Sequence, residues 1–362
     1  MGMTSGDSVG VRARRCRAPV LASACLAALV GCSNSAAVVP VAPGPSSAAA
    51  VGTAAPDITM PGLGMGVGRS GATPGPAAGA ALLSSADVAD FRERFGESAG
   101  VAVVGLNGAE PQVLGDARTP YAWSTSKVLV VAALVRDVGG AANLTDEQRE
   151  LVTAALGASD NESAALLMAE LEARHNDLTG ALAVLTDLLR AAGDDRTTAA
   201  ATDDYSTGET VWALSEQARF LGAVTRGCLL DPASTRYLLA EMGGVIEEQR
   251  WGLGEVGSDA FKGGWDVDDE DLLYVRQVGL LTAADGHPYV VALSARTPIP
   301  EAPVPPADEP AADFEGKWGG KDGEWPSQGG FDYTFTGSED LAGEVAAWVQ
   351  QRVATAPRPT PC

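Results

Sequence analysis

Residues that bind metals are scarce in this chain of 362 residues. It has two histidines, His175 and His287, which lie far apart, and no CxxC pair among its five cysteines. Zinc and related sites need closely spaced histidine or cysteine ligands. The sequence therefore predicts no metal centre, and nothing in it calls for another cofactor.

Positive charge is also in deficit. The chain has 25 lysines and arginines against 47 aspartates and glutamates, which gives a formal net charge of -22. Proteins that bind nucleic acids present a basic surface to the phosphates. The charge balance therefore argues against a nucleic-acid partner.

The N-terminal apolar run, Ala18 to Val30, is too short to span a bilayer permanently as a helix. It follows several arginines, as in an export signal, and it ends in a Leu-Val-Gly-Cys sequence that resembles the lipobox of bacterial lipoproteins. We expect residues 1–31 to be removed as a lipoprotein signal peptide. Cys32 would then carry a lipid that anchors the protein to the outer face of the cell membrane. An ordinary signal peptide with an incidental cysteine would still give export.

The rest of the chain divides by composition. Residues 32–83 are rich in Ala, Pro, Gly and Ser and predict a flexible tether. Residues 84–356 predict one globular domain, with an exposed Pro-rich acidic loop at 297–330, and residues 357–362 form a tail. Cys228 and Cys362 remain after lipidation. A disulfide is permitted outside the cytoplasm, but the Pro-rich tail leaves pairing and free thiols equally open.

The order of elements predicts an α+β fold. An antiparallel sheet is flanked by N- and C-terminal helices, and an all-helical lobe is inserted between the first strands and the later ones. We expect the ligand site in the cleft between the lobes. The first expected helix begins at Ser85, and later helices are expected at 161–174, 178–191, 210–224, 232–242 and 338–353. Strands are expected at 100–106, 112–114, 260–265, 272–282 and 288–295.

Ser124 and Lys127 form a Ser-x-x-Lys motif at the start of an apolar run, Val128 to Val135, which predicts a buried helix. Residues three apart on a helix share a face, so the lysine can reach the serine hydroxyl. A serine becomes a nucleophile when a base takes its proton, and a lysine with a lowered pKa can be that base. Alternatively, Ser124 is a helix cap and Lys127 extends into solvent.

Two further segments carry polar groups that suit chemistry. Ser159-Asp160-Asn161 opens a predicted helix, and Lys262-Gly263-Gly264 lies in a predicted strand. A glycine edge lets a ligand backbone approach closely, and the lysine supplies a cation for a carboxylate. Each segment also has a simpler interpretation. Ser159 and Glu162 fit a capping box, and the glycines fit an ordinary edge strand.

Taken together and in this order, the three motifs resemble those of the class A β-lactamases and penicillin-binding serine hydrolases. Softer matches at 122–124 and 249–254 extend the resemblance, which covers roughly residues 85–355. It implies the β-lactamase/transpeptidase-like fold. It also implies a serine hydrolase that forms an acyl-serine intermediate with β-lactams or with the D-Ala-D-Ala end of a cell-wall peptide.

The resemblance implies four catalytic residues. Ser124 would be the nucleophile and Lys127 its proton acceptor. Ser159 would pass a proton to the leaving nitrogen, and Lys262 would hold Ser159 and the substrate carboxylate electrostatically.

It also implies a set of substrate-binding residues. Asn161 would bind the substrate amide, and Gly264 would let the substrate approach. The backbone N–H group of Trp265 would form an oxyanion hole with that of the nucleophile. Arg276, on the next strand, is a candidate for a second carboxylate counter-ion.

The sequence departs from the family pattern at two places. Gly263 stands where a threonine or serine is usual, which removes one hydrogen bond to a carboxylate, worth about 1.5–3 kcal/mol. The loop at 193–208 has four aspartates but lacks the Glu and the following Leu-Asn of class A β-lactamases, where the Glu positions the water that releases the acyl group. The nearest glutamate, Glu209, is predicted to open the next helix. Acylation is expected, but fast deacylation is not. The acidic segment 266–271 is in the simpler interpretation a solvated hairpin tip. If it overhangs the cleft, it should disfavour anionic substrates such as penicillins, unless Lys262 and Arg276 outweigh it.

Two interpretations follow. In the first, the chain is an exported, monomeric, class A β-lactamase-like serine hydrolase, with DD-carboxypeptidase activity as a variant of the same chemistry. In the second, it keeps the fold without turnover and binds a cell-wall peptide or a partner protein. Covalent labelling of Ser124 by a penicillin distinguishes the two.

Overall fold

The computed structural model describes residues 81–115, 121–202, 206–267, 272–298 and 331–362, all within one compact unit, Gly71–Cys362. The predicted signal peptide, Cys32, nearly all of the tether and residues 299–330 of the predicted loop lie outside the described residues.

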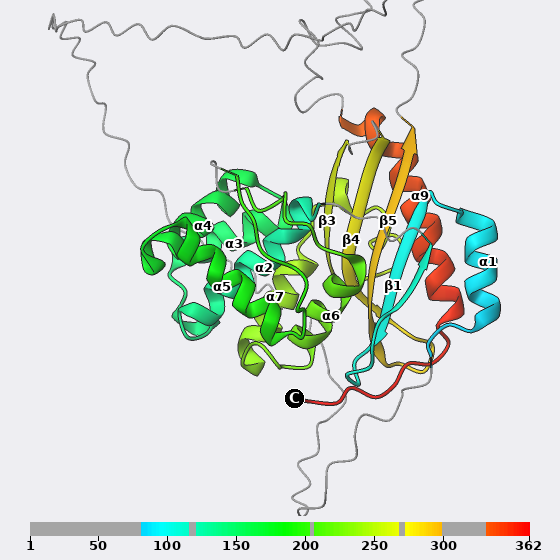
Figure 1. Cartoon of the computed structure of the whole chain (residues 1–362), viewed down its shortest axis with the longest axis horizontal. Coiled ribbons are helices and arrows are strands. Elements are labelled where there is room, and N and C mark those ends of the chain that lie inside the picture. Colours follow the sequence, from blue (N-terminus) through cyan, green and yellow to red (C-terminus); the bar gives the residue numbers. More distant parts are fainter. Residues whose placement is uncertain (1–80, 116–120, 203–205, 268–271, 299–330) are drawn as a thin grey trace, which may run out of the picture. The chain divides into compact units, whose positions relative to one another are not determined.

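A five-stranded antiparallel sheet forms the centre of the domain (Figure 1). Its order is β2-β1-β5-β4-β3, so that β3, which carries Lys262, is an edge strand. The first and last strands in sequence are neighbours, with Ala99 opposite Ala295. The strands are β1 (Ala99–Gly105), β2 (Gln112–Gly115), β3 (Ala260–Val267), β4 (Leu272–Thr282) and β5 (Pro288–Pro298). The predicted α+β fold is thus confirmed.

Both faces of the sheet are covered, because side chains alternate between two hydrophobic cores. Along β1, Val101 and Val103 join the core under α1 (Ser85–Phe95) and α9 (Phe331–Arg352). Ala102 and Val104 face the opposite core, under the inserted helices. On the first side, Trp348 of α9 packs edge-on against Phe91 of α1, with ring centroids 5.0 Å apart.

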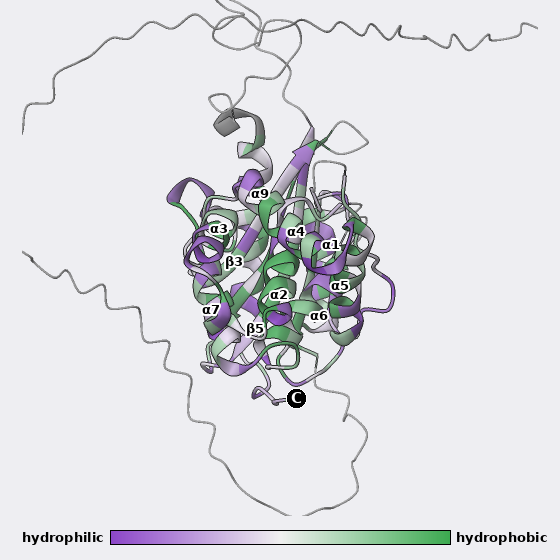
Figure 2. Cartoon of the chain, turned by 90° about the vertical axis from the view of Figure 1, so that its left-hand side faces the viewer, coloured by the Kyte–Doolittle hydropathy of each residue, from purple (hydrophilic) through white to green (hydrophobic). Residues whose placement is uncertain are grey.

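The inserted lobe surrounds one apolar helix. Every residue of α2 from Val128 to Val135 is buried, and α2 packs against α3, α4, α5 and α7 (Figure 2). This lobe comprises η1 (Trp123–Ser126), α2 (Lys127–Asp137), η2 (Ala141–Asn143), α3 (Asp146–Gly157), α4 (Asn161–His175), α5 (Leu178–Ala191), α6 (Leu214–Thr225), α7 (Pro232–Gly243) and η3 (Glu247–Gln249). No helix within the described ranges is both long enough and apolar enough to cross a membrane.

Some boundaries differ from those predicted. The turn carrying Ser124 is a 3-10 helix, and α2 begins only at Lys127. The helix expected from residue 210 begins at Leu214, because Val211 forms an isolated β-bridge with Tyr121. The first helix is capped by Ser84, one residue earlier than expected.

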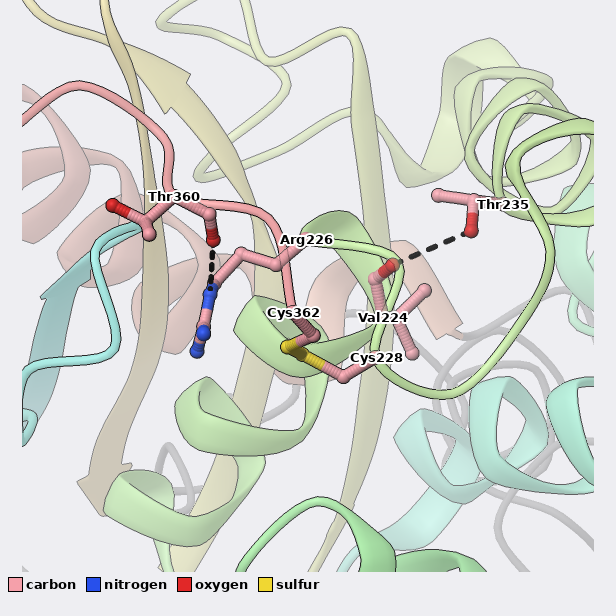
Figure 3. Close-up of a disulfide and its surroundings, with 6 residues drawn as sticks. All are labelled: Val224, Arg226, Cys228, Thr235, Thr360 and Cys362. Atoms are coloured by element: carbon pink, nitrogen blue, oxygen red, sulfur yellow. Dashed lines mark hydrogen bonds between the residues drawn. A yellow bond between two sulfur atoms is a disulfide. The ribbon is translucent and has the colours of Figure 1, made fainter. Parts of the chain in front are cut away.

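The C-terminal tail is fastened to the domain (Figure 3). Cys228, just after α6, forms a disulfide with Cys362, with Cα atoms 5.1 Å apart. The N–H of Thr360 donates to the carbonyl of Leu106 at 2.7 Å, and Arg226 donates to the carbonyl of Thr360 at 2.9 Å. Of the two possibilities that the sequence left open, the structure has the disulfide.

Candidate active site

Ser124 and Lys127 meet at the start of α2. The 3-10 turn places the serine directly before the helix, and the lysine amine lies 2.9 Å from the serine Oγ. The amine also lies 2.5 Å from the carbonyl oxygen of Ser159 and 2.6 Å from Oδ1 of Asn161. Lys127 is thus buried and held in place, and the alternative of a lysine extending into solvent is wrong.

The contacts of the Lys127 amine suit both of its protonation states. A neutral amine has two hydrogens and one lone pair, whereas a carbonyl oxygen and an amide oxygen can only accept. The ammonium form donates to Ser124, Ser159 and Asn161. In the neutral form the two hydrogens can remain with Ser159 and Asn161, and the lone pair can then accept the proton of Ser124. Burial lowers the pKa of Lys127 to about 8, while the carboxylate of Asp160 opposes that shift.

Ser159 connects the two lysines of the site. Its backbone has a φ of 61°, an uncommon conformation for a residue other than glycine. Both its carbonyl and its hydroxyl face Lys127, the hydroxyl at 3.3 Å. Asp160 is the residue that caps α4, because its side chain accepts the N–H of Ser163 at 2.7 Å. The capping box of Ser159 with Glu162 is therefore absent, and the Ser159 hydroxyl remains available to the lysines.

Lys262 approaches Ser159 from β3. Its amine donates to Oγ of Ser159 at 2.8 Å and to the carbonyl of Gly263 at 2.8 Å. Burial, followed by the nearby cation of Lys127, lowers the pKa of Lys262 well below its ordinary value. Two amines thus share one hydroxyl, and a charged Lys127 makes protonation of Lys262 less favourable.

A cavity of about 340 Å³ opens onto Ser124. Trp123 and Trp265 are among its lining residues, as are the carboxylates of Glu162 and Asp266; the full lining is Trp123, Ser124, Ser126, Lys127, Asn161, Glu162, Ala164, Ala165, Ser206, Thr207, Gly208, Trp265 and Asp266. Ser159 and Lys262 are not part of this lining and are connected to Ser124 through Lys127. Within the described ranges no three His, Cys, Asp or Glu side chains gather to hold a metal ion.

Gly264 brings β3 against the nucleophile turn. A Cβ atom at this position would lie 2.9 Å from the backbone nitrogen of Ser124 and 3.0 Å from that of Thr125. Only glycine lets the two backbones approach this closely. The next residue, Trp265, lines the cavity, so the backbones that carry both expected oxyanion N–H groups border the same space.

Arg276 does not reach the cavity. It is fully buried on β4, opposite Gly264, and it donates to the carbonyls of Tyr121 and Trp212 and to Oε1 of Gln217. The expectation that it would pair with a substrate carboxylate does not fit this placement, because the guanidinium points beneath the nucleophile turn.

The loop before α6 brings hydroxyls to the site. Its described residues on the cavity are Ser206, Thr207 and Gly208. Thr207 Oγ1 is hydrogen-bonded to Oγ of Ser126 at 2.7 Å. Asp194 is buried and accepts N–H groups of its own loop, Asp195 and Glu209 are exposed and do not line the cavity, and Asp203 and Asp204 lie outside the described residues.

The glycine at 263 has a local cause. A Cβ atom there would lie 3.1 Å from Cζ2 of Trp251, which is tighter than ordinary contact. The indole of Trp251 packs edge-on against that of Trp265. A threonine or serine at this position would therefore have to displace the Trp251 ring.

Comparison with known proteins supports the fold. The chain matches no protein-family model and no curated protein sequence. Among solved structures it is similar to the TLA-3 extended-spectrum β-lactamase, with a TM-score of 0.52 and 13% identity over 75% of this chain and 98% of that one. A class A β-lactamase from Bacteroides cellulosilyticus gives the same score and identity, over 74% and 98%. The chain has the β-lactamase fold. At these identities the likeness establishes the architecture only.

Sequence reasoning missed the residues behind the nucleophile. Asp160 was assigned no role, although its carboxylate acts on the pKa of Lys127. Gln217 and Thr125 were also missed, although both are fully buried polar residues. The available signal was weak. Thr125 is a β-branched polar residue within the motif, and Gln217 is one of several polar residues of α6, among which Glu216 and Thr225 are also buried.

Proposed function

We propose that this chain is an exported serine hydrolase of the class A β-lactamase type, which forms an acyl ester at Ser124. The observation that carries the proposal is the placement of Lys127. Its amine lies 2.9 Å from Oγ of Ser124, while two carbonyl-type oxygens occupy its hydrogens. The substrates would be β-lactams or peptides that end in D-Ala-D-Ala.

Acylation uses the described groups as follows. The Ser124 hydroxyl gives its proton to Lys127 as Oγ bonds to the substrate carbonyl carbon. The negative charge on the carbonyl oxygen is stabilised by the N–H groups of Ser124 and Trp265. The C–N bond then breaks, and the leaving nitrogen takes a proton that passes from Lys127 through the hydroxyl of Ser159. Lys262 keeps that hydroxyl oriented.

Substrate binding in this proposal is asymmetric. Asn161 gives its oxygen to Lys127, and its amide nitrogen has no partner among the described residues, so it can donate to a substrate carbonyl. Glu162 and Asp266 add negative charge to the cavity wall, while Lys262 lies too deep to touch a substrate directly. Substrates with two carboxylates should therefore bind less well than those with one.

Release of the acyl group is the slow step in this proposal. No carboxylate of the described part of the 193–210 loop lines the cavity, so none of those described carboxylates serves as a general base for water. The acyl-enzyme should consequently persist for longer than that of an efficient β-lactamase.

Location and partners are part of the same proposal. Export through the N-terminal signal would place the domain outside the cytoplasm, and a lipid on Cys32 would anchor it to the membrane. The domain would act there as a monomer on a small β-lactam or on the stem peptide of the cell wall.

A fluorescent penicillin tests the proposal. The wild-type protein should become covalently labelled, and the label should be absent from Ser124→Ala. Mass spectrometry of the labelled protein should locate the acyl group on the peptide containing Ser124. A chromogenic cephalosporin then measures turnover, which should be slow compared with labelling. A wild-type protein that takes up no label would overturn the proposal.

The absence of the hydroxyl at Gly263 favours a second candidate, a domain that binds cell-wall peptide without turnover. In that case a D-Ala-D-Ala peptide would bind equally to the wild type and to Ser124→Ala, and neither protein would be labelled.

A further inference from the structure

A buried hydrogen-bonded chain runs beneath the turn that carries Ser124. Arg276 donates from Nη2 to Oε1 of Gln217 at 3.0 Å, and Gln217 donates from Nε2 to Oγ1 of Thr125 at 2.6 Å. The Thr125 hydroxyl in turn donates to the carbonyl oxygen of Ala122. All three side chains are fully buried, and the last of them belongs to the residue that follows the nucleophile.

The hydrogen bonds of this buried chain can run in only one direction, from donor to acceptor. A guanidinium has donors and no acceptor, so the oxygen of Gln217 must face Arg276 and the amide nitrogen must face Thr125. The threonine hydroxyl has one hydrogen, and because its oxygen accepts from Gln217, that hydrogen is directed to Ala122. Each orientation therefore depends on the one before it.

The hydrogen-bonded chain contacts the turn that carries Ser124 on both sides of that serine. Arg276 also binds the carbonyl of Tyr121, before the turn. At the end of the chain, the Ala122 carbonyl accepts both the hydroxyl and, at 3.1 Å, the backbone N–H of Thr125. The backbone between these points carries the Ser124 hydroxyl and one N–H of the expected oxyanion hole.

Stability alone does not account for this arrangement. Arg276 has no carboxylate partner in the described part of the chain, and burial lowers its pKa to about 10. A buried cation that is bound only by neutral oxygens is costly to fold, and an apolar side chain would fill the space at lower cost. The role left for the Arg276 cation is to fix the direction of the hydrogen-bonded chain.

We propose that Arg276, Gln217 and Thr125 are positioning residues that fix the backbone of the turn carrying Ser124 for acylation. This inference rests on the proposed function. It assigns to the three residues an effect on the rate of acylation and none on the binding of the substrate.

Two substitutions interrupt the chain. Thr125→Val keeps the shape of the side chain and removes the hydroxyl. Gln217→Glu gives Arg276 a carboxylate but takes away the N–H that Thr125 accepts. The matched control is Thr225→Val on α6, which removes a buried hydroxyl that donates to the helix carbonyl of Leu221 at 2.8 Å, away from the site.

The time course of labelling is measured at several concentrations of fluorescent penicillin. It gives the maximal rate constant, the half-saturating concentration and the fraction of protein that reacts. Thr125→Val and Gln217→Glu should each lower the maximal rate constant about tenfold, as expected for one neutral hydrogen bond. The half-saturating concentration and the reacting fraction should stay at the wild-type values. The double variant should be no slower than the slower single variant, because both interrupt one chain.

Different failures are distinguishable. A variant that folds poorly loses reacting fraction, but the rate constant of its folded part still tests the inference. If Thr125→Val and Gln217→Glu react at the rate of Thr225→Val, the inference is wrong and the proposed function stands. If the wild type takes up no label, both are wrong.

Discussion

The lowered pKa of Lys127 predicts how the reactivity of Ser124 depends on pH. If Lys127 is the base, as proposed, it accepts the serine proton only when its amine is neutral. With a pKa of about 8 instead of 10.5, roughly one lysine in ten is neutral at pH 7, which is about 300 times the fraction for an exposed lysine. The acylation rate should therefore rise about tenfold per pH unit below the pKa and level off above about pH 8.

Substitution of Asp160 tests this pH dependence, because Asp160 affects the pKa of Lys127. Its carboxylate raises the pKa of Lys127 against the larger effect of burial. In Asp160→Asn the cap of α4 can persist, because asparagine is a good N-cap, but the negative charge is lost. The midpoint of the pH profile should therefore move to lower pH, and the acylation rate at pH 7 should increase.

The assay is stopped-flow labelling with a fluorescent penicillin between pH 5.5 and about 9.5, a range that brackets the lowered pKa of about 8. The control is Asp177→Asn, because Asp177 caps α5 in the same manner, with its side chain accepting the N–H of Gly180. That variant should keep the wild-type midpoint. A wild-type rate that still rises tenfold per pH unit at the upper end of this range, or equal shifts in the two variants, would refute the assignment of Lys127 as the base.

Three further predictions concern other parts of the domain. The disulfide between Cys228 and Cys362 spans 134 residues, so replacing both cysteines with serine should lower the free energy of unfolding, measured by urea denaturation, by up to about 5 kcal/mol. A variant with the wild-type denaturation midpoint would contradict the anchoring of the tail. Lys127→Ala should slow labelling by about 10²–10⁴-fold with little loss of stability, and labelling at the wild-type rate would show that another group is the base. Gly263→Ser alone should raise the affinity for a β-lactam carboxylate only slightly, because its Cβ atom meets Trp251 at 3.1 Å. Adding Trp251→Phe should raise that affinity about tenfold or more, the value of a hydrogen bond to a charged group. A full gain from the single change would show that the indole moves aside readily.

The architecture could be predicted because hydrophobic periodicity determines it. The run that forms α2 is apolar without interruption from Val128 to Val135, and the predicted limits of β4 are those observed. Boundaries set by tertiary contacts were harder to predict. The start of α6 shifts by several residues because Val211 pairs with Tyr121, which no local pattern reveals.

The candidate site was predictable in its members more than in its geometry. Three separated motifs placed Ser124, Lys127 and Ser159 together through a resemblance, while spacing alone supported only the first pair. The positive φ of Ser159 is a property of the fold, so a cap by Ser159 was as reasonable as the cap by Asp160 that forms. Arg276 faces the same side of the sheet as Lys262 and Gly264, but its guanidinium is bound by the carbonyls of Tyr121 and Trp212 and by the amide oxygen of Gln217. These partners come from distant segments that no local pattern reveals.

The Ser159–Lys262 contact joins groups that are 103 residues apart in the chain. A nascent or partly unfolded domain can form α2 and α4, yet it still lacks the amine that completes the relay until β3 docks against β4. Reactivity at the nucleophile is therefore a property of the finished domain, and covalent labelling should count native molecules rather than merely helical ones.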